Sequence, residues 1–314
     1  MNGPVPAPSP WLPTAPCTPG RRCAAHPDPL PAAGAARAAF RPAPAPLAFA
    51  RLAAGLATVL LGVLLLPVAG PLPAAVRYAL VRLWTRAVVR AFGVRLTVTG
   101  ALPGAGRSAL VVANHVSWLD IPVVAAVLPG RMIAKREVRG WPVLGPLAAL
   151  GGTLFIDRDG LRRLPGTVRE VAGALAEGGR VTAFPEGSTW CGRDGGRFRP
   201  ALFQAAVDTG SDIQPVRIGY RPEGAAAYVG EDPLGASLWR VARTPGLTVE
   251  IRILDPISAI QYPDRRLLAA AAQRAVLPAS YRAVASDSAK RPSVSVHQRV
   301  SSKPASASSA RTPS

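Results

Sequence analysis

Residues 108–120 read SALVVANHVSWLD, an apolar run that ends in a polar turn. The run at 108–114 is short and rich in β-branched residues, which predicts a strand buried on both faces. His115 and Asp120 follow at once, and His115 is the sole histidine between residues 27 and 296. In open sheets of parallel strands, reactive groups gather in loops at the carboxyl ends of the strands. The stretch therefore predicts a central strand together with a candidate functional site.

Short β-rich runs alternate with helical patterns over the rest of the middle of the chain. Helices are expected near Trp118 and at 160–177, 200–209 and 262–276. The alternation predicts the α/β class, with a mainly parallel sheet flanked by helices and preceded by an N-terminal membrane-associated helical segment. The other strands are expected at 94–100, 131–135, 153–157, 180–186, 212–218 and 247–254.

Composition divides the chain into four segments. Both ends carry too few large apolar side chains to offset the entropy lost on ordering, so both are expected to be disordered. The segments are a Pro/Ala/Arg-rich head (1–45), a membrane anchor with a basic amphipathic helix (46–92), an α/β domain (93–280) and a basic Ser-rich tail (281–314).

The net charge of +19 lies mainly outside the predicted α/β domain, since residues 97–276 contribute only +5. Basic segments beside an apolar one favour an anionic membrane surface as their partner. A nucleic-acid-binding protein should carry its basic, aromatic-bearing face within the folded domain, so nucleic acid is not expected. The three cysteines form no C-x-x-C pair, and no zinc site or disulfide framework is expected.

The apolar stretch between Arg51 and Arg77 is of awkward length for a membrane span. Its uninterrupted part, LAAGLATVLLGVLLL (52–66), precedes three prolines. Fifteen helical residues cover about 22 Å, less than the roughly 30 Å of a hydrocarbon core. Two interpretations stay open, a proline-kinked span and a helix that dips into one leaflet. A cleaved signal peptide is disfavoured, because about 50 residues precede the stretch.

The following segment, 76–92, has a basic face and an apolar one. Arg82, Arg86 and Arg90 recur every four residues, and Trp84 and Phe92 belong to the opposite, apolar side. This pattern is typical of a helix lying in the lipid headgroup layer. The same apolar side could instead pack on the protein's own core.

His115 and Asp120 have two interpretations of comparable weight on their own. Ser117 and Asp120 could simply cap the helix near Trp118. Alternatively, a carboxylate on one imidazole nitrogen leaves the other nitrogen as a general base near neutral pH. The chain has no G-x-S-x-G nucleophile motif and no Walker loop. Direct attack by a hydroxyl of the acceptor is the chemistry that remains.

Four sequence blocks in order resemble the glycerolipid acyltransferase family, which contains the 1-acyl-sn-glycerol-3-phosphate acyltransferases. They are NHVSWLD (114–120), GTLFIDR (152–158), FPEGS (184–188) and IQPV (213–216). The resemblance covers residues 94–254 and implies that His115 is the general base, oriented by Asp120. It also implies direct attack on an acyl thioester, without an acyl-enzyme.

The resemblance further implies which residues bind substrate. In the second block, Phe155, Asp157 and Arg158 match, and Arg158 is expected to bind an acceptor phosphate; an alternative is a surface ion-pair cluster. Pro215, in the fourth block, is associated with the acyl chain and the shape of the site. Glu186, Gly187 and Ser188 match the third block, which is associated with acceptor binding.

Alternatives apply to several of these residues. Glu186 could cap a turn. Lys135 and Arg136 could contact phosphate or groups of the thioester donor, but solvated surface charge is the favoured interpretation. Many lysophosphatidate enzymes carry an arginine in the third block, and this chain does not. Arg193, Arg197 or Arg199 could substitute for it, or the acceptor could differ.

The expected reaction is transfer of an acyl chain from acyl-CoA or acyl-carrier protein to 1-acyl-sn-glycerol-3-phosphate, giving phosphatidate. Another acceptor, such as a lyso-ornithine lipid or other lysophospholipid, is the main alternative. A lipid hydrolase or transacylase and a non-catalytic membrane adaptor are the competing classes. No metal or bound cofactor is implied. The protein is expected at the cell membrane with its α/β domain on the cytoplasmic side, where both donors are found.

Overall fold

The computed structural model describes residues 41–277 except 105–106, 142–143, 158–160 and 231. The predicted disordered head and tail thus lie almost entirely outside the described residues. A seven-stranded sheet forms the centre of the fold, and its strand order is β1-β7-β6-β2-β5-β3-β4. All neighbouring strands are parallel except β6 and β7. The predicted mainly parallel α/β sheet is confirmed.

The bounds of the strands agree closely with the expected runs. The strands are β1 (Arg95–Thr99), β2 (Ala109–Ala113), β3 (Arg131–Lys135), β4 (Leu154–Ile156), β5 (Arg180–Ala183), β6 (Asp212–Arg221) and β7 (Thr248–Ile253). The α-helices are α2 (Ala45–Ala69), α3 (Ala74–Ala91), α4 (Asp120–Ala125), α5 (Leu144–Leu150), α6 (Leu164–Ala176), α7 (Phe203–Thr209), α8 (Leu234–Arg243) and α9 (Arg265–Val276). Three 3-10 turns occur at Arg136–Gly140, Leu161–Arg163 and Ala259–Gln261. Helices α5 and α8 and the antiparallel pairing of β6 with β7 were not anticipated from the sequence.

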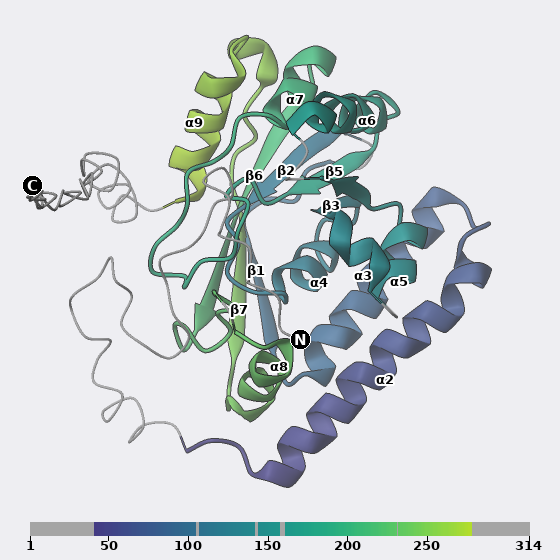
Figure 1. Cartoon of the computed structure of the whole chain (residues 1–314), viewed down its shortest axis with the longest axis vertical. Helices are drawn as coiled ribbons and strands as arrows, with labels where there is room; N and C mark the ends of the chain where they lie inside the picture. Colours follow the sequence, from purple (N-terminus) through teal and green to yellow (C-terminus); the bar gives the residue numbers. More distant parts are fainter. Residues whose placement is uncertain (1–40, 105–106, 142–143, 158–160, 231, 278–314) are drawn as a thin grey trace, which may run out of the picture.

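Strand β2 is buried on both faces, as its unbroken apolar run requires. Val111 and Ala113 join one core, which α3, α4, β6 and β7 complete. Leu110 and Val112 join the other core, with α6, α7 and α9. The sheet therefore separates two helical layers, which lie on opposite sides of it in Figure 1. The loop after β2 emerges at the centre of the sheet.

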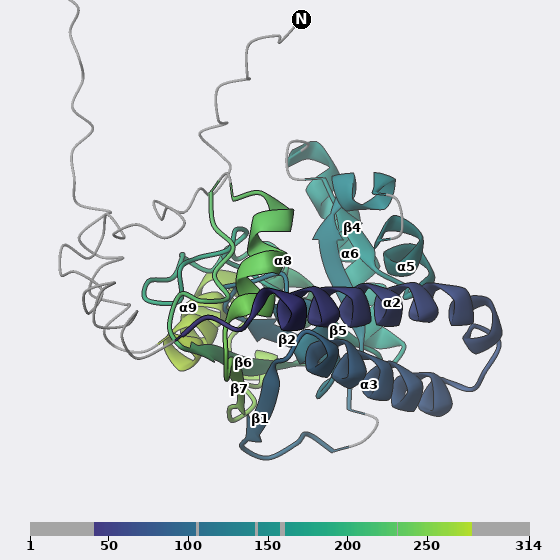
Figure 2. The same ribbon diagram turned by 90° about the horizontal axis from the view of Figure 1, so that it is seen from below.

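Helices α2 and α3 lie side by side as an antiparallel pair (Figure 2). Glycine permits their close approach, because a Cβ at Gly55 would lie 2.5 Å from the Phe92 ring. Trp84 Nε1 of α3 donates to the Thr58 carbonyl of α2 at 2.8 Å. Val88 and Phe92 are buried in the core beside the sheet. The side of 76–92 that carries Trp84, Val88 and Phe92 thus packs on the protein itself, which agrees with the second interpretation of this segment.

Apolar exposure concentrates on the outer face of α2 instead. Five of its leucines (Leu56, Leu60, Leu61, Leu64 and Leu65) are among the exposed large apolar side chains. Residues Ala45–Leu65 form the one helix in the described ranges that is long and apolar enough to cross a membrane. The helix continues through Pro67, so it is longer than the uninterrupted run in the sequence indicated.

Candidate active site

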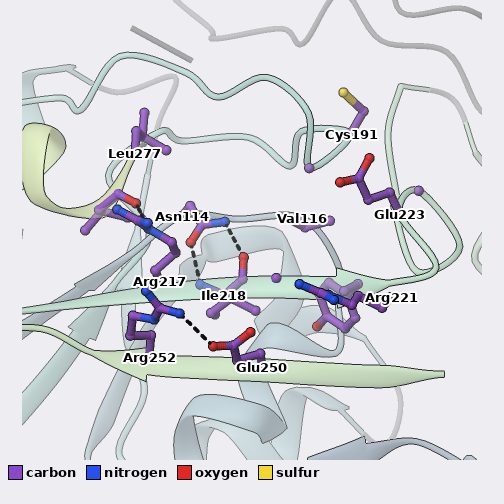
Figure 3. A pocket seen from close by; sticks show the side chains of 15 residues that line it. Asn114, Val116, Cys191, Arg217, Ile218, Arg221, Glu223, Glu250, Arg252 and Leu277 are labelled. Atoms are coloured by element: carbon purple, nitrogen blue, oxygen red, sulfur yellow. Dashed lines mark hydrogen bonds and ion pairs between the residues drawn. The ribbon is translucent and has the colours of Figure 1, made fainter. Parts of the chain in front are cut away.

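The loop that carries His115 begins with a clamp between β2 and β6. Asn114 Nδ2 donates to the Ile218 carbonyl at 2.9 Å, and the Ile218 N–H donates to Asn114 Oδ1 at 2.8 Å (Figure 3). The side-chain amide therefore continues the hydrogen-bond ladder one residue beyond the end of β2. This arrangement fixes where the chain leaves the sheet, immediately before His115.

His115 and Asp120 are in direct contact. His115 Nδ1 lies 2.8 Å from Asp120 Oδ2. An ionised carboxylate only accepts hydrogen bonds, so Nδ1 carries the proton and donates it. The His115 side chain keeps 17% of its surface exposed, whereas the Asp120 side chain is fully buried. Among the described residues nothing bonds to Nε2, so its lone pair is available to a substrate.

Asp120 accepts hydrogen bonds on both of its oxygens. Oδ2 also receives the backbone N–H groups of Val116 at 2.6 Å and Ser117 at 2.8 Å. Oδ1 receives the phenol of Tyr220 at 2.6 Å. Four donors around a buried carboxylate fix the plane of its oxygens.

The helix-capping interpretation holds only in part, because the N-cap residue of α4 is Leu119 and no side chain caps the helix there. Asp120 is the first residue of α4, and its carboxylate folds back onto the N–H groups that precede the helix. Ser117 Oγ accepts from the Leu119 N–H at 3.3 Å. The Asp120 carboxylate therefore orients the imidazole and holds the turn before α4, without capping the helix itself.

His115 makes two further contacts, one through its ring and one through its backbone carbonyl. The ring of Phe184 stacks on it at a centroid distance of 4.1 Å and an interplanar angle of 16°. The backbone N–H of Trp190 donates to the backbone carbonyl of His115 at 2.7 Å. Both contacts come from the segment after β5, which lies beside β2 in the sheet. The first and third sequence blocks therefore meet at His115.

Glu186 lies beneath this loop and is 1% exposed. Its Oε2 accepts from the His115 N–H at 2.8 Å and its Oε1 from the Gly196 N–H at 3.1 Å. A Cβ on Gly195 would lie 2.9 Å from Oε1, so glycine is needed for this approach. Burial raises the pKa of Glu186 well above 4.5, against the lowering effect of the two backbone N–H groups. The contacts of Glu186 join two loops, and neither oxygen points to open space.

The other residues of the third and fourth blocks have different surroundings. Gly187 has a φ of +75°, a backbone conformation that residues with a Cβ rarely adopt. Ser188, the next residue, is partly exposed. Pro215 is buried in β6 opposite Val112 of β2. Pro215 thus lies in the sheet before the strand reaches the level of His115.

The second block lies farther away, at the edge of the sheet. Strand β4 is three strands from β2, which is about 14 Å at about 4.8 Å per strand. Asp157 pairs with Arg163 at 2.9 Å and with Arg136 at 3.7 Å. Phe155 is partly buried, with the Arg139 guanidinium 5.8 Å from its ring centroid. Arg158 lies outside the described residues.

The three arginines considered as substitutes in the Gly-rich stretch are not equivalent. Arg193 Nε lies 3.3 Å from Glu223 Oε2, so this guanidinium has a carboxylate partner. Arg197 and Arg199 are exposed. Neither of the latter two lines the hollow beside the His115 loop, so a substitute for the missing arginine stays a prediction.

A hollow of about 290 Å³ opens beside the His115 loop, over β6 and β7 (Figure 3). Asn114 and Val116, which flank His115 in the sequence, contribute to its wall. Its wall also includes charged side chains of both signs. They are Arg217, Arg221, Glu223, Glu250 and Arg252.

Sequence reasoning missed Asn114, Phe184 and Tyr220 as parts of the site. Asn114 and Phe184 lie within quoted blocks but carried no assigned role. Tyr220 lies 100 positions after Asp120 and belongs to no block, so no spacing pattern pointed to it. Only the position of β6 next to β2 reveals this contact.

Comparison with known proteins adds an independent observation. The model of a protein family described as "Acyltransferase" matches residues 95–219. The lyso-ornithine lipid O-acyltransferase of Pseudomonas aeruginosa is 39% identical over 208 residues, which cover 64% of this chain and 78% of that one. The 1-acyl-sn-glycerol-3-phosphate acyltransferase of Neisseria meningitidis is 35% identical over 208 residues, which cover 65% of this chain and 80% of that one.

A solved structure supports the fold. The crystal structure of the 1-acyl-sn-glycerophosphate acyltransferase of Thermotoga maritima superposes with a TM-score of 0.54 at 21% sequence identity. The alignment covers 77% of this chain and 99% of that chain. At this level of identity the likeness shows a shared fold.

Proposed function

Because the chain belongs to the acyltransferase family that includes the 1-acyl-sn-glycerol-3-phosphate and lyso-ornithine lipid enzymes, we propose that it acylates a lyso-lipid hydroxyl at a membrane. The donor is an acyl thioester, acyl-CoA or acyl-carrier protein, and the first candidate acceptor is 1-acyl-sn-glycerol-3-phosphate. The observation that carries the proposal is the His115–Asp120 contact with Nε2 left available.

The geometry supports a general-base mechanism. Nε2 of His115 takes the proton of the acceptor hydroxyl while that oxygen attacks the thioester carbonyl carbon. The imidazolium that forms is stabilised by the Asp120 carboxylate across the 2.8 Å contact. The carbon–sulfur bond then breaks, and the thiolate leaves with the proton from Nε2. The products are the diacylated lipid and the free thiol.

Removing the base tests this proposal. His115→Ala in purified membranes, with labelled 1-acyl-sn-glycerol-3-phosphate and acyl-CoA, should lose phosphatidate formation by about 10²-fold or more. Acyl transfer left intact in His115→Ala would show that the base is another group. Free fatty acid without new phosphatidate in the unmodified protein would indicate a hydrolase.

A lyso-ornithine lipid is the second candidate acceptor, and one structural feature favours it. The hollow beside His115 carries both arginines and glutamates, which suits a headgroup with both a carboxylate and an ammonium. A phosphate acceptor would gain from the arginines alone. Screening lyso-lipid acceptors against one acyl-CoA, with Glu223→Gln as a variant, decides between them. Loss of rate for the amino-acid lipid alone in Glu223→Gln would support the second candidate.

We further propose that the outer face of α2 enters one membrane leaflet. The first turns of α2 are fixed to the α/β body, because Phe49 contacts Trp239 at 4.8 Å and Arg51 donates to the Ala242 carbonyl. The exposed leucines lie on the turns that follow. Because its start is fixed to the α/β body, α2 is better suited to entering one leaflet than to crossing the bilayer. In this arrangement the α/β body faces the cytosol, where the acyl donors are found.

Charge on this face tests the membrane proposal. Leu61→Glu combined with Leu64→Glu should shift the protein from sedimenting vesicles of anionic lipid to the supernatant. Leu267→Glu, an equally exposed leucine on α9, is the matched control and should leave sedimentation unchanged. Removing α2 and α3 altogether is unsuitable, because Val88 and Phe92 belong to the core.

A further inference from the structure

Tyr220 is a buried tyrosine whose hydroxyl meets the carboxylate that orients His115. Its side chain is 6% exposed and belongs to the core between the sheet and α3 and α4. The phenol donates to Asp120 Oδ1 at 2.6 Å. Among the described residues it is the one side chain that bonds to this oxygen, since His115 and the two backbone N–H groups all bond to Oδ2.

The sheet delivers Tyr220 to this position. Strand β6 pairs with β2 only up to Val216, opposite Ala113, and then continues to Arg221. Beyond β2 it pairs with β7 alone, with Tyr220 opposite Val249. The extended end of β6 therefore passes beneath the loop that carries His115. Alternation along the strand points Val216, Ile218 and Tyr220 to the same core, and the last of them reaches Asp120.

The chemistry of the pair makes Tyr220 a donor at all relevant pH values. Burial raises the pKa of the phenol well above 10, and the neighbouring Asp120 charge raises it further. A neutral phenol beside an ionised carboxylate donates a hydrogen bond and draws negative charge toward Oδ1. The strength of this hydrogen bond thereby sets how much charge remains on Oδ2 to face the imidazole.

We propose that Tyr220 is a positioning residue for acyl transfer, which holds the Asp120 carboxylate so that Oδ2 meets His115 Nδ1. This proposal rests on the proposed general-base function of His115. Besides His115 and Tyr220, the titratable group near Asp120 is Glu186, whose pKa the Asp120 charge raises. Tyr220 alone among these three bonds to Oδ1.

Removing the hydroxyl is the direct test. Tyr220→Phe should lower kcat about tenfold with the KM of acceptor and donor unchanged. With the phenol gone, more charge remains on Oδ2 and stabilises the imidazolium. The acidic limb of the kcat/KM profile should therefore move to higher pH. Tyr262→Phe is the matched control, because Tyr262 packs against the other core and should change neither quantity.

A second variant keeps the volume and the hydroxyl, in case Tyr220→Phe does not fold. Tyr220→3-fluorotyrosine makes the phenol a stronger donor, so the acidic limb should move to lower pH at an unchanged melting temperature. The proposal would be overturned if the acidic limb of the kcat/KM profile kept its pH position in both variants. A kcat of Tyr220→Phe within twofold of that of the unmodified protein would also overturn it. A raised acceptor KM at constant kcat would also overturn it, because that pattern indicates substrate contact.

The same assays separate this proposal from the function it rests on. If the unmodified protein transfers no acyl chain to any lyso-lipid, the proposed function fails. If it does transfer and the Tyr220 variants match it at every pH, the function stands and only the positioning role fails.

Discussion

Two of the four sequence blocks differ sharply in their physical surroundings. The loop after β2 holds His115 through a buried carboxylate with four donors, at the centre of the sheet. The end of β4 lies at the sheet edge, where Asp157 shares exposed guanidinium partners. Buried hydrogen bonds to a charge contribute far more than exposed ion pairs. Two blocks that are equally easy to recognise in the sequence therefore contribute unequally to stability. The His115 loop is held rigidly, whereas the charged side chains at the end of β4 are held only by weak, exposed ion pairs.

The largest effect is expected from Asp120→Asn, at the rigid end of this contrast. An amide cannot accept from every surrounding N–H and O–H donor, and it does not stabilise an imidazolium as a carboxylate does. We expect kcat to fall by about 10³- to 10⁴-fold. Steady-state kinetics with saturating acyl-CoA checks this. A loss of less than tenfold would mean that the carboxylate only holds the turn before α4.

A smaller effect is expected from Glu186→Gln, which should lower kcat about tenfold. The amide accepts from only one of the two backbone N–H groups that Glu186 binds, so the His115 loop is held less firmly. Acceptor KM should stay within about twofold to threefold, since neither oxygen faces open space. A large rise in acceptor KM at constant kcat would instead place Glu186 in substrate binding, as the sequence resemblance suggested.

Glu186→Gln should also change the pH dependence of stability. The pKa of Glu186 is raised by burial, so the folded state retains a proton that the unfolded chain loses above about pH 4.5. The folded state of the unmodified protein therefore loses stability as the pH rises from 4.5 toward the raised pKa. The variant has no titrating group at this position. The difference in melting temperature, variant minus unmodified protein, should therefore increase as the pH rises. Parallel curves between pH 4.5 and 8 would contradict this expectation.

For Arg158, the phosphate-binding role that the sequence resemblance implies predicts that Arg158→Ala acts on binding alone. We expect the KM for a phosphate-bearing acceptor to rise about five- to tenfold, with little change for a phosphate-free one, because a guanidinium gains most from a dianion. Acceptor titrations with both lipids provide the measurement. Equal effects on the two acceptors would remove Arg158 from the role of a phosphate clamp.

The smallest effect is expected from Asp157→Asn. Its partners Arg136 and Arg163 are exposed, so the ion pairs should contribute less than about 1 kcal/mol to the free energy of unfolding. Activity should stay within about twofold. Chemical denaturation and initial rates check both quantities. A large loss of activity would show that the edge of the sheet is as tightly specified as its centre.

Much of the fold was predictable from local sequence patterns. The apolar run before Asn114 indicated a strand buried on both faces, and β2 is that strand. The helix at 160–177 was expected from its apolar spacing, and α6 buries Thr167, Val171, Ala174 and Leu175 of it. The apolar side of 76–92 had two interpretations, the headgroup layer and the protein's own core, and Val88 and Phe92 pack in the core. Amphipathic spacing shows that a helix has an apolar side, but it does not show what covers that side.

The sequence by itself determined the class of the fold, the family and the His115–Asp120 pair. These depend on local periodicity and on residues five positions apart, which a single turn brings together. Only the tertiary structure decided the roles of Tyr220, Asn114 and Phe184. Their contacts join strands and loops that are distant in the chain, and strand order is not encoded in any short pattern. The extended end of β6 brings Tyr220 to Asp120 across 100 residues of sequence, because parallel strands become neighbours only when the whole sheet has formed.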